Sequence, residues 1–182
     1  DYATGNQITK TNFVINGNGH TIDCNNQARA FNITGNNTKI NNLIIKNGFY
    51  ELGSAISTKV SITLNNVTFI NCSGNGTNNL GAVFTNGPLL TISNCKFINT
   101  SGTEGASVTA YYSAVNITNS TFMSSSDKIN KGHIYVYESE LLVSSSDFLN
   151  TTAKYATAIF AEDKCAILLE DTKFRNLFAN MT

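Results

Sequence analysis

The sequence predicts an all-β fold, a parallel β-helix in which about six to seven coils of roughly 25 residues stack on one another. Three observations support this prediction. An aromatic or aliphatic residue recurs at steps of 24 to 28 residues, two further apolar positions recur with a similar period, and all three lie where apolar and polar residues alternate. Such a period is typical of solenoids, in which each repeat buries its apolar face only against its neighbours.

The first ladder is aromatic in all but one coil. It consists of Ile45, Phe69, Phe97, Phe122, Phe148 and Phe174. An Asn follows most members two residues later, at Asn47, Asn71, Asn99, Asn150 and Asn176, with Ser124 in the remaining coil. Asn tolerates the left-handed backbone of tight turns, and stacked Asn side chains form hydrogen bonds from coil to coil. We therefore expect these Asn residues to be structural.

Two further ladders keep step with the first. One lies between its members and consists of Ile56, Val83, Val108, Ile134 and Ile159. The other lies five residues before each member and consists of Ile40, Leu64, Ile92, Ile117, Val143 and Leu169. Alternation such as Ile62-Thr63-Leu64 predicts short, half-buried strands, and no long stretch has apolar residues at helical spacing.

The length and composition fit a single domain over residues 1–182. The chain is long enough for a continuous core, and its 12 Lys and Arg residues balance its 12 Asp and Glu residues. Only 13% of residues are charged, so nucleic acid is not an expected partner. No apolar stretch approaches the roughly 20 residues of a membrane span. Residues 1–12 are polar and lack an initiator Met, which predicts an N-terminal cap or linker in a fragment of a longer surface protein.

Ten Asn-x-Ser/Thr sequons favour an exported glycoprotein, although an Asn- and Thr-rich solenoid also produces sequons by composition alone. They begin at Asn32, Asn36, Asn66, Asn71, Asn75, Asn99, Asn116, Asn119, Asn150 and Asn180. The four Cys residues (Cys24, Cys72, Cys95 and Cys165) lack the spacing of a zinc site. Cys95 replaces an apolar core residue of earlier coils, so we expect it to be buried.

The opening coils carry a family resemblance. The run FVINGNGHTID at residues 13–23, followed by Phe31-Asn32-Ile33-Thr34 and Ile40-Asn41-Asn42-Leu43, resembles archaeal adhesin-like surface proteins of methanogens. Gly81-Ala82-Val83 and Gly105-Ala106-Ser107 are similar to repeats of chlamydial polymorphic outer membrane proteins, also adhesins. The resemblance covers roughly residues 11–178 and implies a right-handed parallel β-helix. It is less specific for function, because the same fold carries polysaccharide-active enzymes.

An aromatic surface is the strongest functional signal. Val108 and Ile134 are expected to point inward, so the residues that follow them point outward. The predicted ligand-binding residues are Phe84, Tyr111, Tyr135, Tyr137 and Phe160, with His133 beside them. Exposed aromatic side chains favour contact with a sugar or a protein. Two alternatives stay open: a loop or neighbouring domain covers these residues, or a one-residue shift of the register buries all of them.

Two carboxylates form a candidate metal site. Alignment of Ile134 with Ile159 places Glu138 beside Asp163 on consecutive coils. Carboxylates roughly 5 Å apart are able to hold a cation such as calcium. The alternative is a solvated turn with ordinary acidic side chains, and we expect no other cofactor.

The resemblance and the aromatic surface together lead us to expect a cell-surface or secreted adhesin-like domain. Its expected partner is a glycan or protein of a host or neighbouring cell, with no catalytic residues. One alternative is a polysaccharide lyase or hydrolase, which needs clustered carboxylates and, in lyases, a basic residue. The only Arg residues, Arg29 and Arg175, lie far apart in the sequence. The other alternative is a structural stalk with no ligand site.

Overall fold

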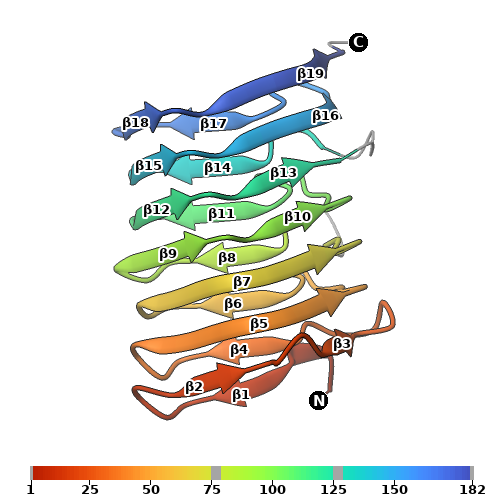
Figure 1. Cartoon of the computed structure of the whole chain (residues 1–182), viewed down its shortest axis with the longest axis vertical. Coiled ribbons are helices and arrows are strands. Elements are labelled where there is room, and N and C mark those ends of the chain that lie inside the picture. Colours follow the sequence, from red (N-terminus) through yellow and green to blue (C-terminus); the bar gives the residue numbers. More distant parts are fainter. Residues whose placement is uncertain (1, 75–78, 125–128, 181–182) are drawn as a thin grey trace.

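The computed structural model describes residues 2–74, 79–124 and 129–180. Coils follow one another along the long axis, from the N-terminus at one end to the C-terminus at the other (Figure 1). All strands pair in parallel, and the described residues contain no helix other than the 3-10 turn η1, Tyr2–Thr4. The predicted all-β parallel solenoid is therefore confirmed.

One face of the solenoid is a seven-stranded sheet, with one short strand from each coil. In spatial order its strands are β1 (Asn6–Ile8), β4 (Phe31–Ile33), β6 (Ile56–Thr58), β8 (Val83–Thr85), β11 (Val108–Tyr111), β14 (Ile134–Tyr137) and β17 (Ile159–Glu162). The order follows the sequence because each coil adds its strand directly after that of the preceding coil. The first strand lies within the segment predicted as a cap or linker and pairs with β4, so this segment contributes a strand to the solenoid.

The opposite face is a twelve-stranded sheet. Its strands are β2 (Val14–Asn16), β3 (Thr21–Asp23), β5 (Thr38–Lys46), β7 (Ile62–Ile70), β9 (Leu89–Ser93), β10 (Lys96–Ile98), β12 (Ala114–Thr118), β13 (Thr121–Met123), β15 (Glu140–Ser144), β16 (Asp147–Ala153), β18 (Ala166–Glu170) and β19 (Lys173–Ala179). In the second and third coils this face is one nine-residue strand, and in the first and the later coils it divides into two strands.

The predicted aromatic ladder forms a continuous ring stack inside the solenoid. Phe69, Phe97, Phe122 and Phe148 are fully buried. Consecutive rings have centroids 4.7, 4.9 and 4.7 Å apart and lie within 12° of parallel. Each buried Phe side chain contributes roughly 1.5–3 kcal/mol through the hydrophobic effect. Except for Leu169 in the last coil, the other two ladders line the same core, which also contains Cys95, as predicted.

Asn residues make the turns. Asn42, Asn66, Asn94 and Asn119 all have φ between 45 and 55°, in the left-handed region that Asn tolerates. Their side chains connect the coils: the Nδ2 of Asn66 donates to Asn42 at 2.8 Å, and that of Asn119 donates to Asn94 at 2.6 Å. The Asn residues predicted at turns behave in the same way: the Nδ2 of Asn176 donates to Asn150 at 2.9 Å, and φ lies between 48 and 55° at Asn47, Asn71, Asn99, Asn150 and Asn176. A glycan at Asn66 or Asn119 would compete with these bonds, and the sequon at Asn75 lies outside the described residues.

The last coil has no neighbour on its outer side within the described residues. Strand β18 is exposed along its whole length. Phe174 continues the ring stack on Phe148 at 5.2 Å but remains 44% exposed. The same ladder position is therefore fully buried in the middle of the solenoid and half-covered at its end, which provides an internal comparison.

We predict that Phe122→Ala lowers the free energy of unfolding by about 3–5 kcal/mol, because it opens a cavity in the ring stack between two Phe neighbours. Phe174→Ala is the matched control and should cost clearly less, since its ring is part-exposed. Urea unfolding followed by circular dichroism measures both changes. Equal losses in the two variants would contradict the ring stack as the main packing interaction.

Candidate ligand-binding surface

The aromatic residues predicted as a binding surface lie on the outer face of the seven-stranded sheet. Tyr135 pairs in register with Thr109 and Phe160, and Thr109 pairs with Phe84. The alternating inward ladder of Val83, Val108, Ile134 and Ile159 is also in register. Val83, Val108 and Ile134 belong to the hydrophobic core, whereas Phe84 and Tyr135 do not, so the one-residue shift considered from the sequence is excluded.

The expected exposure is wrong for two of these residues. Phe84 is only 6% exposed and Tyr135 only 3%, whereas Tyr111, Tyr137 and Phe160 are part-exposed. Neighbouring side chains cover both rings: Tyr111 packs against Phe84 and Tyr135, and Tyr135 also contacts Phe160 and Lys131. The Thr109 hydroxyl donates to the carbonyl of Glu104, and a Cβ on Gly105 would lie 2.9 Å from the backbone nitrogen of Tyr135. The segment before β11 thus lies against the sheet near Thr109 and Tyr135, whereas Tyr111, Tyr137 and Phe160 stay part-exposed.

The placement of His133 beside the exposed surface is also wrong. Its ring is fully buried and lies against the rings of Phe122 and Phe148. The chain turns at Gly132, with φ of 78°, and brings His133 inside before the alternation of β14 begins. Its two nitrogens lie 2.8 Å from the Ser107 hydroxyl and 2.9 Å from the Thr151 hydroxyl. Burial lowers the pKa of His133 to about 3, so the ring is neutral at physiological pH.

Hydrogen bonds and ion pairs fix the tyrosines on this face. The Tyr111 hydroxyl donates to Glu104 at 2.5 Å, and the Tyr135 hydroxyl donates to Glu162 at 2.7 Å. The Lys131 ammonium joins the two carboxylates, 3.3 Å from Glu104 and 3.0 Å from Glu162. The network therefore joins three consecutive coils.

The same contacts shift the pKa values of Tyr111, Tyr135 and Glu162. Burial, followed by the bonds to Glu104 and Glu162, raises the pKa of Tyr111 and Tyr135 well above the usual phenol value. The hydrogen bond from Tyr135, reinforced by Lys131, lowers the pKa of Glu162. At neutral pH these tyrosines are thus neutral donors beside charged carboxylates.

The tyrosine rings enclose a small hollow. It measures about 220 Å³ and is lined by Tyr111, Tyr112, Tyr135, Tyr137 and Glu104. Tyr111 meets Tyr135 and Tyr137 at 88° and 90°, with centroids 5.9 Å apart. Tyr112 closes the cluster against Tyr137 at 82°, and it is 60% exposed. These three ring pairs each meet edge to face, and all four rings line the hollow.

Glu138 and Asp163 occupy equivalent turn positions on consecutive coils, with φ of 42° and 60°. Hydrogen bonding to Asp163, reinforced by its charge and by Glu138, raises the pKa of Tyr137. Among the described residues no three His, Cys, Asp or Glu side chains gather at one point. Since calcium takes six to eight oxygen ligands, the two carboxylates would need several waters, and calcium binding here stays a prediction.

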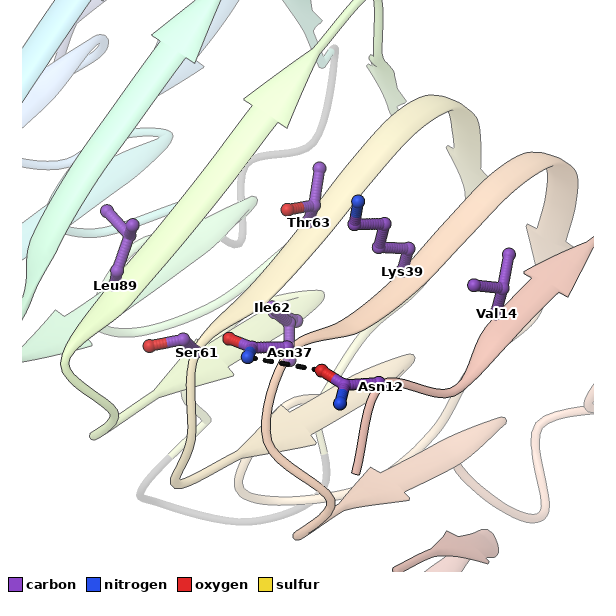
Figure 2. Close-up of a pocket in the computed structure, with 8 residues that line it drawn as sticks. All are labelled: Asn12, Val14, Asn37, Lys39, Ser61, Ile62, Thr63 and Leu89. Carbon is purple, nitrogen blue, oxygen red and sulfur yellow. Dashed lines mark hydrogen bonds between the residues drawn. The ribbon is translucent and has the colours of Figure 1, made fainter. Parts of the chain in front are cut away.

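A second hollow lies on the twelve-stranded sheet near the N-terminus. Figure 2 shows Val14, Lys39 and Thr63 on consecutive coils, with Asn37 donating to Asn12 at 3.3 Å. It is larger, at about 410 Å³, but its lining contains one charged group and no aromatic ring. A hollow lined by mixed polar and aliphatic side chains offers little to hold a ligand in one orientation.

Sequence reasoning missed Tyr112, Glu104 and Lys131. Glu104 precedes Gly105 and Lys131 precedes Gly132, and both glycines have positive φ where the chain enters β11 and β14. The sequence did contain a signal for these two residues, because opposite charges precede equivalent glycines in consecutive coils. No sequence pattern indicated Tyr112, because its position depends on a left-handed backbone, with φ of 53°, at a non-Gly, non-Asn residue.

None of the described helices is both long and apolar enough to cross a membrane. Searches of protein-family models, curated proteins and solved structures gave no match to this chain. The side chains of this surface therefore carry the evidence for its function.

We predict that acidification destabilises the protein in part through His133. The ring has a pKa of about 3 when folded and about 6.5 when unfolded, so the unfolded state binds more protons between these values. The free energy of unfolding therefore falls as the pH is lowered through this window. His133→Gln, which does not titrate, should show a shallower fall in urea unfolding between about pH 7 and about pH 4. If the free energy of unfolding falls equally with pH in both proteins, His133 does not contribute to the pH dependence.

Proposed function

We propose that this domain is the binding domain of an adhesin-like protein at the cell surface or in the secreted fraction. Its partner is a glycan or protein of a host or neighbouring cell. The proposal depends chiefly on one observation: part-exposed tyrosines gather on the outer face of β11 and β14 around a hollow, with their hydroxyls held by carboxylates.

The chemistry of the tyrosines supports binding. Tyr supplies a flat apolar ring with a polar tip, which suits both sugars and protein surfaces. Exposed aromatic side chains oppose solubility and commonly mark contact surfaces. Because hydrogen bonds already fix Tyr111 and Tyr135, a ligand would not have to order those two rings, which lowers the entropic cost of binding.

The shape of the molecule agrees with this proposal. A solenoid presents an extended outer surface, and the tyrosine hollow is small and open. Such a surface suits attachment to part of a large partner. The archaeal adhesin-like family, which the opening coils resemble, gives the proposed location at the surface of a cell.

We predict that Tyr112→Asn combined with Tyr137→Ser weakens binding to glycan arrays and intact cells at least about tenfold, since aromatic contact residues commonly contribute more than 1 kcal/mol each. Asn is chosen because it tolerates the left-handed backbone at Tyr112. Tyr155→Ser is the matched control, because Tyr155 is 52% exposed and does not line the hollow.

The same assay separates the alternatives. Release of soluble sugar from a bound polysaccharide would place the protein among the enzymes. Absence of binding by the folded domain would favour a structural stalk. Equal loss of binding in the Tyr155→Ser control would move the site away from the tyrosine hollow.

A further inference from the structure

The tyrosine hollow has the form of an aromatic cage. Tyr137 meets Tyr111 at 90° and Tyr112 at 82°, and all three rings line the same small space. The buried Tyr135 lies at its base and Glu104 lies on its wall. A flat sugar stacks best on a flat platform, whereas perpendicular rings suit a compact, rounded group.

The charge around the hollow is negative. Glu104 lines it, Glu138 and Asp163 interact with the Tyr137 hydroxyl, and Glu162 accepts from Tyr135. An adjoining hollow is lined by Glu140 and Lys164 as well as by Tyr112 and Glu138. Five carboxylates thus face two lysines, and one of these, Lys131, already forms ion pairs with two of them. An anionic ligand is disfavoured, and a cation is attracted.

The same face already holds one ammonium group over aromatic rings. The Lys131 nitrogen lies 4.8 Å from the ring centroid of Tyr135 and 5.2 Å from that of Phe160. Both distances are within the roughly 6 Å of a cation–π interaction. The neighbouring hollow offers the same combination of rings and carboxylate, and none of the described residues that line it is a Lys or Arg.

The geometry points to a binding site for an alkylammonium group, enclosed by Tyr111, Tyr112 and Tyr137, with Glu104 as the counter-charge. This inference rests on the proposed binding function of the surface and names the chemistry of its ligand. Aromatic rings and a nearby carboxylate both attract a cation, and the electrostatic attraction of a ring face is retained by quaternary ammonium groups that donate no hydrogen bond. A neutral group of equal size would gain the apolar contact but not the charge interaction.

The test compares two ligands of nearly equal shape. Choline carries a trimethylammonium group, and 3,3-dimethyl-1-butanol carries carbon in place of the nitrogen. The chain has 7 Tyr and no Trp, so tyrosine fluorescence reports binding directly. We expect choline to bind at least about tenfold more tightly than the neutral alcohol. Equal affinities, or no binding of choline, would overturn the inference.

Variants locate the site. Glu104→Gln keeps the size of the side chain and should reduce the choline affinity towards that of the neutral alcohol. Tyr112→Asn removes one wall, at a residue exposed enough to leave the fold intact, and should also weaken choline. Tyr155→Asn should leave binding unchanged. Unchanged choline affinity in both Glu104→Gln and Tyr112→Asn would contradict the assignment of this hollow.

A third arm separates the sources of the ammonium group. A peptide with trimethyl-lysine and the same peptide with unmodified lysine represent a protein partner, and choline represents a lipid or glycan headgroup. Preference for any of these supports the cation site and identifies its source. If cells bind through the tyrosines but choline does not compete, the inference fails and the proposed function stands. If choline binds and cells do not, the proposed adhesive function fails.

Discussion

Parallel pairing of strands in register from coil to coil is the constraint on which the rest of this structure depends. Because Phe97 pairs with Phe122 and Tyr111 pairs with Tyr137, each position of the coil becomes a column of side chains. A slip of one residue would exchange the inner and outer columns. The same pairing therefore places the Phe stack inside, the Asn side chains at the turns and the tyrosines on the outer face.

The segments that lead into the strands determine how much of the outer column is exposed to solvent. The small side chain of Thr109 lets the backbone near Glu104 approach the sheet, and this approach covers part of the surface between Phe84 and Tyr135. The Glu104 side chain and Lys131 then hold the neighbouring hydroxyls and carboxylates in place. The surface combines a buried aromatic base with part-exposed walls, an arrangement that fixes the rings before a ligand arrives.

Much of the fold was predictable because each ladder repeats one local choice. Phe148 and Asn150 occupy positions that most coils fill with the same residue type, so periodicity alone identified them. The sequence predicted which aromatic residues share the outer face, but not how much of each side chain is exposed to solvent. The sequence predicted His133 beside the exposed aromatic surface, but the turn at Gly132 places its ring in the core. The contact of Glu104 with Tyr111 depends on the conformation of one loop, and the repeat does not determine that conformation.

The most direct test of this account is disulfide formation across the tyrosine face. In a Cys165→Ser background, Tyr111→Cys with Tyr137→Cys places two thiols on paired residues, whose Cα atoms lie roughly 5 Å apart in a parallel sheet. Tyr111→Cys with Tyr135→Cys places them on a diagonal, roughly 8 Å apart and beyond disulfide reach. The account predicts a disulfide in the first pair under mild oxidation and none in the second. A disulfide in the diagonal pair alone would contradict the register, and with it the composition of the tyrosine surface.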